Sequence, residues 1–393
     1  MTGFIILMAS LMSVVAISID AVLPALGYIG TDLGVAYPNQ VQYVISILFA
    51  GMAIGQLIYG PMSDAMGRKK VLYIGLGFYA LGSVICYASQ DLNQMLLGRL
   101  IQGFGIASPY ISTMAIIRDK YAGRDMARVM SLVMVIFILV PCIAPSLGQL
   151  IITFFSWRII FLFYVVMIAG MVSYIFLRLE ETLPPEQRVT FSLAHLSRGF
   201  KEVLSNRHTM GYTLCMGAVF GSFMGYLNSA QQIFQGQFHT GKWFTLYFGL
   251  LALVFGLSSL VNSHVVKKLG MRHICLRGTI ATIIASIVFI SLSYMVAISL
   301  WMFLMYAAIL IFVCGLMFGN LNSLAMEPMG HIAGLAAAVT GFISTILSMV
   351  MGAVIGQLYD NTVTPIAMGF LVAGIMALAA MYWAERGKLD FKS

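Results

Sequence analysis

Two ionisable residues, Asp20 and Arg99, lie inside long apolar runs of this sequence. Asp20 belongs to the run VVAISIDAVLPAL (residues 14–26), and it is the only one of the fourteen acidic residues that lies well inside such a run. A charged side chain there costs about 3 kcal/mol unless it is protonated, meets water or pairs with an opposite charge. Proton exchange at a buried carboxyl group is therefore the first chemistry that these residues indicate.

The two residues are expected to meet. At about 1.5 Å per helical residue, Asp20 and Arg99 both lie roughly 8–10 Å from the same end of their runs. Apolar surroundings favour the protonated form of a carboxyl group, and a nearby guanidinium group favours the ionised form. We therefore expect Asp20 to bind and release a proton and Arg99 to tune it. The alternative is a structural ion pair that only fixes two helices together.

The composition requires membrane-spanning elements around these residues. The 393-residue chain is 60% hydrophobic and only 9% charged, whereas about 25% of the residues of a soluble protein are charged. Its apolar runs have the length of about 20 residues that a transmembrane helix needs. They do not alternate apolar and polar residues as the strands of a membrane barrel do. The sequence thus predicts an all-α integral membrane protein.

Breaks rich in Gly, Pro, Asn and charged residues divide the chain into twelve predicted spans. They cover residues 4–27, 41–63, 71–89, 94–117, 126–152, 158–178, 208–234, 243–266, 273–292, 298–325, 331–357 and 362–384.

The basic residues predict the orientation of these spans. Of the 22 Lys and Arg residues, nineteen fall in the connections and tail on one side of the predicted membrane. Because short cytoplasmic loops carry the excess of basic residues, this side is predicted to be cytoplasmic, and it holds both termini. The net charge of +8 then follows from topology, so we expect the lipid bilayer as a partner and no nucleic acid.

The longest polar connection separates two blocks of six spans. We expect an N-terminal six-helix bundle over 1–178, a cytoplasmic linker over 179–207 and a C-terminal six-helix bundle with a short tail over 208–393. The linker has the composition of a short surface helix from about 191 to 204. Similar Gly-Gln-Leu stretches recur in spans 2, 5 and 11, and internal repeats of three spans are typical of secondary transporters.

The sequence GPMSDAMGRKK follows the second span and supplies a candidate conformational latch. Gly60 permits close helix approach, and Gly67 suits a tight turn. Asp64 is placed to accept hydrogen bonds from Arg68, with Lys69 adding a second cation. Such a charged cluster can hold helix ends together in one state and release them in another.

This stretch resembles the signature of the major facilitator superfamily, G-x-x-x-D-x-x-G-R-R/K. The run RLIQG, which contains Arg99 and Gln102, resembles the R-x-x-Q-G motif of that family. The run APSLGQ around Pro145 and Gly148 resembles the G-P-x-x-G-G motif of its antiporters, although Ala144 and Gln149 replace two glycines.

Three further stretches, SIDAVLPAL, ETLPPE and HIAG, resemble the bicyclomycin/chloramphenicol-resistance (Bcr/CflA) subfamily of drug:proton antiporters. The resemblance implies a major facilitator fold with two six-helix bundles around a central cavity. It also implies a functional monomer in a bacterial cytoplasmic (inner) membrane. Protons are the implied coupling ion, with no other cofactor.

We accordingly expect a proton-coupled exporter of small amphipathic molecules such as drugs, metabolites or siderophores. The alternative is a proton-coupled importer of a small nutrient on the same fold. Polar residues on spans 1, 4, 7 and 10 are the expected cavity lining, since such residues turn away from lipid; bonding between helices is the alternative for each of them. They are Asp20, Arg99, Gln102, Tyr110, Asn228, Gln231, Gln232, Asn320 and Asn322.

Enzymatic and metal-dependent functions find no support in the sequence. It contains no HExxH, GxSxG or GxxxxGK[ST] motif, the last of which an ATP-driven pump would need. The five cysteines are isolated in apolar runs, and the six histidines are scattered. We expect no catalytic residues and no metal ligands.

Overall fold

The structure is a computed structural model that describes residues 2–121, 123–188 and 193–387. All regular elements of these residues are helices. The chain forms two compact units, residues 1–196 and 197–393. The division between the units falls inside the linker predicted over 179–207.

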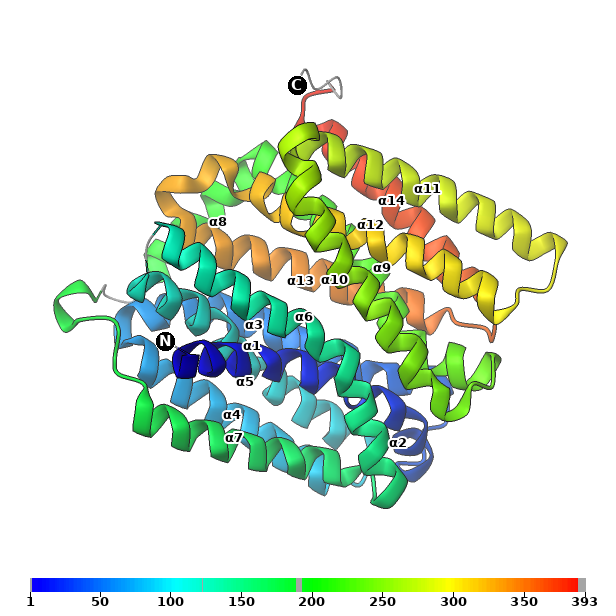
Figure 1. The fold of residues 1–393 in the computed structure, drawn as a ribbon, viewed down its shortest axis with the longest axis horizontal. Helices are drawn as coiled ribbons and strands as arrows, with labels where there is room; N and C mark the ends of the chain where they lie inside the picture. Colours follow the sequence, from blue (N-terminus) through cyan, green and yellow to red (C-terminus); the bar gives the residue numbers. More distant parts are fainter. Residues whose placement is uncertain (1, 122, 189–192, 388–393) are drawn as a thin grey trace. The chain divides into compact units, whose positions relative to one another are not determined.

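The helices of the N-terminal unit run side by side (Figure 1), and most are long enough to cross a bilayer. They are α1 (Thr2–Asp20), η1 (Leu23–Ala25), α2 (Leu26–Asp32), η2 (Pro38–Gln42), α3 (Tyr43–Met66), α4 (Arg68–Ala88), α5 (Leu92–Lys120), α6 (Gly123–Phe154) and α7 (Arg158–Arg178), followed by η3 (Pro185–Gln187). Helix α5 packs against both α3 and α4. This position places its polar residues inside the unit.

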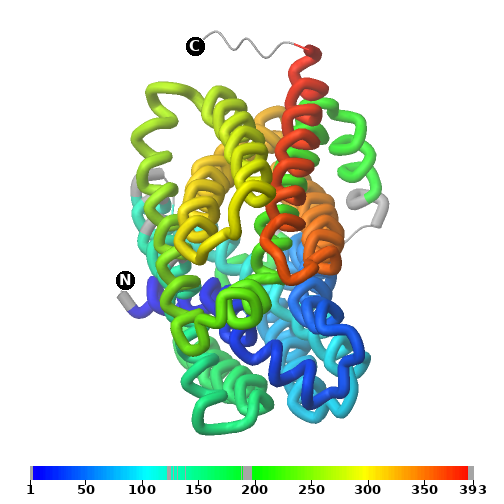
Figure 2. The backbone as a smooth tube through the Cα atoms, turned by 90° about the vertical axis from the view of Figure 1, so that its right-hand side faces the viewer, coloured from blue at the N-terminus to red at the C-terminus, as the bar shows by residue number. Residues whose placement is uncertain are grey.

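The C-terminal unit repeats this bundle architecture (Figures 1 and 2). Helix α8 (Leu193–Ser205) of the linker contains the division between the units and coincides with the predicted surface helix. The other helices are α9 (Arg207–Gln231), the π-helical η4 (Gln232–Gln237), η5 (Gly241–Trp243), α10 (Phe244–Leu269), α11 (Met271–Met295), α12 (Leu300–Met326), η6 (Glu327–Ile332), α13 (Ala333–Gln357) and α14 (Thr364–Ala384).

The predicted number of spans agrees with these helices. Eleven continuous helical runs among the described residues are long and apolar enough to cross a membrane. One of them, Leu300–Gln357, has 58 residues, far more than the roughly 20 that a bilayer requires. It consists of α12 and α13, joined through η6 with non-helical backbone at Met329. Counted separately, these two helices bring the total to twelve.

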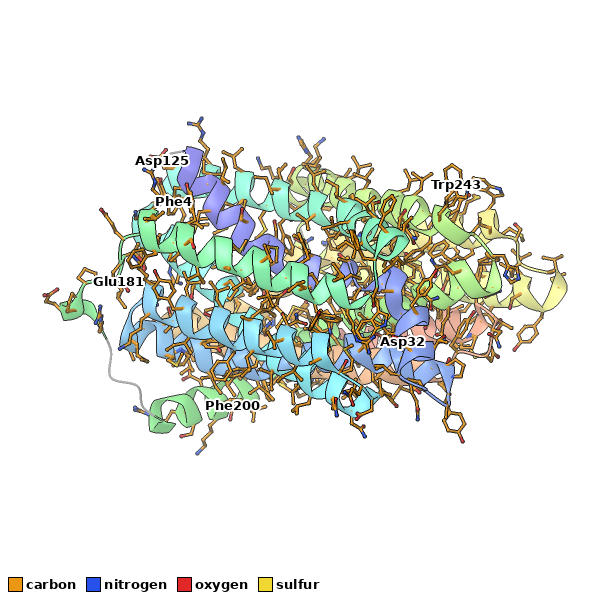
Figure 3. All side chains as sticks on the ribbon, turned by 90° about the horizontal axis from the view of Figure 1, so that it is seen from below. Phe4, Asp32, Asp125, Glu181, Phe200 and Trp243 are labelled. Atoms are coloured by element: carbon orange, nitrogen blue, oxygen red, sulfur yellow. The ribbon has the colours of Figure 1, made fainter. Side chains whose placement is uncertain are left out.

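The helix ends of the N-terminal unit gather at two opposite levels. Phe4, Asp125 and Glu181 lie at one end, and Asp32 lies at the other (Figure 3). At the Asp32 end, the Arg158 side chain binds the Asp32 carboxylate at 2.6 Å. The connections predicted on the basic side of the membrane therefore share one end of this unit.

A glycine turn starts one outer helix in each unit. Gly67 before α4 has a φ of 97°, and Gly270 before α11 has a φ of 77°. Side chains other than glycine rarely adopt such angles. The same device thus occurs before the third long helix of each unit.

Candidate functional site

Asp20 lies where the first predicted span breaks. It is the last residue of α1, and the chain continues through a turn into η1, whose Pro24 has no N–H group to continue the helix. The residue is 5% exposed. Within the described part of the chain, its carboxyl group takes part in no hydrogen bond or ion pair. A buried, unpaired carboxyl group is an unfavourable feature for a purely structural residue.

Arg99 does not pair with Asp20 as predicted. Its guanidinium group is fully buried and donates to the Val44 carbonyl at 2.9 Å, to the Ser18 carbonyl at 3.0 and 3.1 Å, and to the Gln102 side chain at 2.6 Å. Arg99 and Asp20 lie at the same level, since Ser18 is two residues from the acid. The helix break offers a backbone oxygen to the arginine, which the prediction from depth alone missed.

A buried polar network extends from this arginine. The Gln102 amide donates to the Ser83 hydroxyl at 2.8 Å, and the Tyr79 and Ser18 hydroxyls lie 2.5 Å apart. These hydroxyls were missed at the level of sequence, because Ser and Tyr in apolar runs carry no recognisable spacing. Arg99 and Gln102 therefore have their polar atoms engaged with protein groups in this structure.

Helix α6 packs against the chain next to Asp20. A Cβ atom on Gly148 would lie 1.9 Å from the Ala21 carbonyl oxygen, so only glycine allows this approach. Pro145 and Pro141 interrupt the hydrogen bonding of the same helix. The antiporter-like motif thus lies beside the break at Asp20.

The predicted latch residues form a cluster at the Glu181 end of the N-terminal unit. Arg68 donates to Asp64 at 2.5 Å, as the sequence predicted, and also to Asp119 on α5 at 2.9 Å. Gly67 supplies the turn between α3 and α4, and Gly60 lies within α3. The cluster therefore joins the ends of three helices.

Glu181, which follows α7, completes this cluster. Its carboxylate accepts the backbone N–H groups of Arg68 at 2.9 Å and of Lys69 at 3.1 Å. A carboxylate is favourable there because the first N–H groups of a helix lack partners within the helix. Asp119 and Glu181 were not predicted, since each is far from the signature along the chain.

The predicted cargo residues of α9 lie around the start of η4. Asn228 is buried, and the Gln231 amide donates to Gln235 at 3.0 Å. Gln232 is the first residue of η4, and its carbonyl accepts from the Tyr359 hydroxyl at 3.3 Å. π-Helical segments inside α-helices occur frequently at functional sites.

The predicted cargo residues of α12 and α5 differ in how far they are buried. Asn320 is buried on α12 and donates to Asn262 of α10 at 2.8 Å, whereas Asn322 is exposed. Tyr110 on α5 is half-buried. Gln231 and Asn320 therefore bond to neighbouring side chains rather than to each other.

The C-terminal unit contains a charged cluster that the sequence did not reveal. Arg272 donates to Glu385 and to Glu327, each at 2.8 Å. Tyr212 donates to Glu385 at 2.8 Å, and a ring nitrogen of His208 lies 3.4 Å from Glu327. The cluster joins the ends of α9, α11 and α14 with η6.

Comparison with known sequences identifies the family. The sequence model described as Major Facilitator Superfamily matches residues 6–353. The chain belongs to the major facilitator superfamily. The fold, the family and the multi-pass membrane architecture predicted from the sequence are thereby confirmed.

Two relatives match over nearly their full length. The uncharacterized MFS-type transporter YdgK of Bacillus subtilis (strain 168) is 31% identical over 373 residues, 92% of this chain and 90% of that protein. A bicyclomycin resistance protein homolog of Haemophilus influenzae is 25% identical over 383 residues, 97% of this chain and 95% of that protein. The chain is thus a major facilitator transporter with relatives named for drug resistance.

The fold recurs in solved major facilitator structures. The crystal structure of the D-xylose-proton symporter aligns with a TM-score of 0.71 over 97% of each chain at 14% identity. This likeness concerns the fold alone. Within the described residues, no group of three or more His, Cys, Asp and Glu side chains is arranged to hold a metal ion.

Proposed function

We propose that this major facilitator protein exports small amphipathic molecules in exchange for protons by alternating access. The observation that carries the proposal is the buried carboxyl group of Asp20, which has no hydrogen bond or ion pair among the described residues and lies at a break in the first span. Discontinuous membrane helices commonly form the coupling-ion sites of secondary transporters. The relative named as a bicyclomycin resistance protein homolog supports a drug-like cargo.

In the proposed cycle, Asp20 carries the exchanged proton. Facing the periplasm, the carboxyl group takes up a proton and cargo leaves. The protonated, uncharged form is stable in apolar surroundings, so the carrier can change its facing direction. The proton then leaves to the cytoplasm, and the ionised carboxylate favours binding of the next cargo molecule.

Arg99 has a positioning role in this proposal rather than a role in cargo binding. Its guanidinium group is fully buried and bonded to protein oxygens, so it offers cargo no free donor. Cargo that meets Asp20 would therefore face a carboxyl group that no cation pairs with directly, which favours neutral or cationic molecules. Gln102 is set aside for the same reason, because Arg99 and Ser83 engage its amide. The other proposed cargo contacts are Tyr110, Asn228, Gln231, Gln232, Asn320 and Asn322.

The proposed setting follows from the distribution of charge. Nineteen basic residues belong to connections assigned to one side of the membrane, and the positive-inside rule makes that side cytoplasmic. We propose a bacterial inner-membrane protein with both termini in the cytoplasm. It would act as a monomer, with protons as its only coupling ion.

A proton-coupled importer is the second candidate, and a difference from the antiporter motif in α6 favours it. Ala144 and Gln149 replace two glycines of the antiporter motif. Import and export both require a site that exchanges protons, so Asp20 serves either direction. The order of proton and cargo binding is what distinguishes them.

Transport in inverted membrane vesicles tests the proposal. An imposed gradient acidifies the lumen, and chloramphenicol, bicyclomycin, ethidium or a siderophore is added outside while lumenal pH is followed. An exporter raises lumenal pH when its cargo enters, and D20N abolishes the response. D125N, which removes an exposed carboxylate of the same unit, is the matched control and should respond as the wild type does.

A second arm of the experiment identifies an importer. Vesicles are loaded with the probe compound, and its exit is started by dilution. A symporter releases protons together with the compound, whereas an antiporter does not. Full coupled exchange by D20N would rule out Asp20 as the proton carrier.

A further inference from the structure

The backbone just before Asp20 has carbonyl oxygens that the helix break leaves available. In a continuous helix, each carbonyl accepts from the N–H group four residues later. Helix α1 ends at Asp20, and Pro24 in η1 has no N–H group to offer. The Ser18 carbonyl therefore needs another donor, since unsatisfied polar groups are costly inside a membrane, whereas the Ile17 carbonyl keeps the Ala21 N–H at 3.1 Å and can accept a second donor.

Side chains from two other helices supply these donors. The Tyr164 hydroxyl of α7 donates to the Ile17 carbonyl at 3.0 Å. Arg99 of α5 places two nitrogens on the Ser18 carbonyl at 3.0 and 3.1 Å. Both side chains are fully buried. Two carbonyls in the last turn of α1 are thus held by side chains of α5 and α7, and the Ile17 carbonyl has the tyrosine bond in addition to its helical bond.

A third contact involves the side chain of Ser18. Its hydroxyl donates to the Val14 carbonyl at 2.6 Å and lies 2.5 Å from the Tyr79 hydroxyl of α4. Because the single hydroxyl proton of Ser18 is used by Val14, Tyr79 is the donor in the second bond. Gly148 of α6 covers the Ala21 carbonyl on the other side of Asp20.

We propose that Tyr164 and Tyr79 are positioning residues for proton exchange at Asp20, acting through the backbone and hydroxyl of the α1 end. This inference rests on the proposed function. Together with Arg99 and Gly148, the two tyrosines form what we call the Asp20 cradle. In this proposal the four residues fix where the carboxyl group is held.

The physical argument concerns water. A carboxyl group at the end of a helix meets the negative end of the helix dipole, which opposes its ionisation. The hydrogen bonds to the Ile17 and Ser18 carbonyls keep the end of α1 ordered and exclude water from it. When one of these hydrogen bonds is lost, the last turn of α1 frays and water reaches Asp20. Hydration then favours the ionised form of its carboxyl group. The cradle therefore sets how readily the site holds its proton.

Helix α7 also offers a matched control. The Tyr174 hydroxyl donates to the Gly3 carbonyl at 3.4 Å. Tyr174→Phe and Tyr164→Phe thus remove the same kind of bond between the same two helices, α7 and α1. Only the second variant loosens the backbone beside Asp20.

Carbodiimide labelling measures the protonated carboxyl group without any cargo. Dicyclohexylcarbodiimide reacts with protonated carboxyl groups in apolar surroundings, and mass spectrometry of the full-length protein in proteoliposomes locates the product, with D20N as the blank. We expect the labelling rate of Asp20 at pH 7 to fall at least about threefold in Y164F, the ratio that follows from losing one ordinary hydrogen bond. Y79F should change in the same direction, and Y174F should label like the wild type.

The outcomes separate the two proposals. Equal labelling of the wild type, Y164F and Y79F would overturn the positioning role and leave proton exchange at Asp20 intact. A wild type whose Asp20 is not labelled at any pH from 5 to 9 would overturn proton exchange itself. Equal losses in Y164F and Y174F would show a general weakening of α7 packing and overturn the cradle.

Discussion

Each unit gathers carboxylates around one arginine at its helix ends, and in each the arginine follows a glycine turn. In the N-terminal unit, Arg68 comes directly after Gly67 and binds Asp64 and Asp119. In the C-terminal unit, Arg272 comes two residues after Gly270. It binds Glu327 and Glu385. The two clusters are thus built on a similar local plan.

They differ in how deeply the arginine is held. The Arg68 side chain is 6% exposed, whereas the Arg272 side chain is 35% exposed. Glu181 adds a carboxylate on the backbone N–H groups that begin α4. The electrostatic energy of an ion pair depends strongly on its distance from water. Two clusters with a similar arrangement of glycine, arginine and carboxylates can therefore stabilise their units to different extents.

Removing each arginine provides the largest expected contrast. Arg68→Ala leaves Asp119, whose side chain is only 16% exposed, without its cation, so we expect it to lower the free energy of unfolding by about 3 kcal/mol. Arg272→Ala should cost about 1 kcal/mol, since its pairs lie near water. Urea unfolding in detergent micelles, followed by the fluorescence of the four tryptophans, measures both. Equal costs would show that exposure does not distinguish the clusters.

The sequence predicted the local part of the first cluster and missed the distant part. Asp64 and Arg68 are four residues apart and flank the Gly67 turn, so their closeness along the chain makes the contact predictable. Asp119 and Glu181 reach the same arginine only because α5 and α7 end at that level of the unit. Hydropathy places helix ends within a few residues, but it does not pair the side chains on them.

At the site near Asp20, too, the sequence predicted local features and missed contacts that depend on the tertiary structure. The lone acid, the lone base and their common depth were readable from the sequence, and so was Pro24. The break in the first span was not predicted. Because the break gives Arg99 a backbone carbonyl as its partner, the prediction that Arg99 pairs with Asp20 was wrong. The freed Ser18 carbonyl depends on where α1 ends, which composition does not specify.

The two glycine turns provide the next contrast. A Cβ atom on Gly67 would meet the Glu181 carboxylate at 2.5 Å, whereas nothing lies within 4 Å of one on Gly270. Both positions combine a positive φ with a ψ of 154°, a region that essentially only glycine adopts, so an alanine costs about 1 kcal/mol or more at either. We expect Gly67→Ala to cost about 2 kcal/mol because it also displaces Glu181. Unfolding curves that place Gly270→Ala at or above that value would contradict the role given to Glu181.

Glu181 itself is a smaller and more direct test. Glu181→Gln keeps the shape of the side chain but removes the charge that faces the first N–H groups of α4. We expect a loss of about 1 kcal/mol. Glu186→Gln, an exposed residue of η3, should stay within about 0.5 kcal/mol of the wild type. Similar losses in the two variants would mean that the charge acts through the whole surface and not through the cap.

The smallest expected effect is the change that salt makes to the cost of removing each arginine, and it should differ between the two clusters. At 1 M salt the screening length falls to about 3 Å, so pairs that touch water lose most of their attraction. Repeating the urea unfolding at 0.1 and 1 M sodium chloride, we expect the cost of Arg272→Ala to fall below about 0.5 kcal/mol at high salt. The cost of Arg68→Ala should change little, because ions do not reach a side chain that is 6% exposed. If salt weakened both costs in proportion, water would reach Arg68 as freely as Arg272, and the N-terminal cluster would be a surface feature rather than a buried latch.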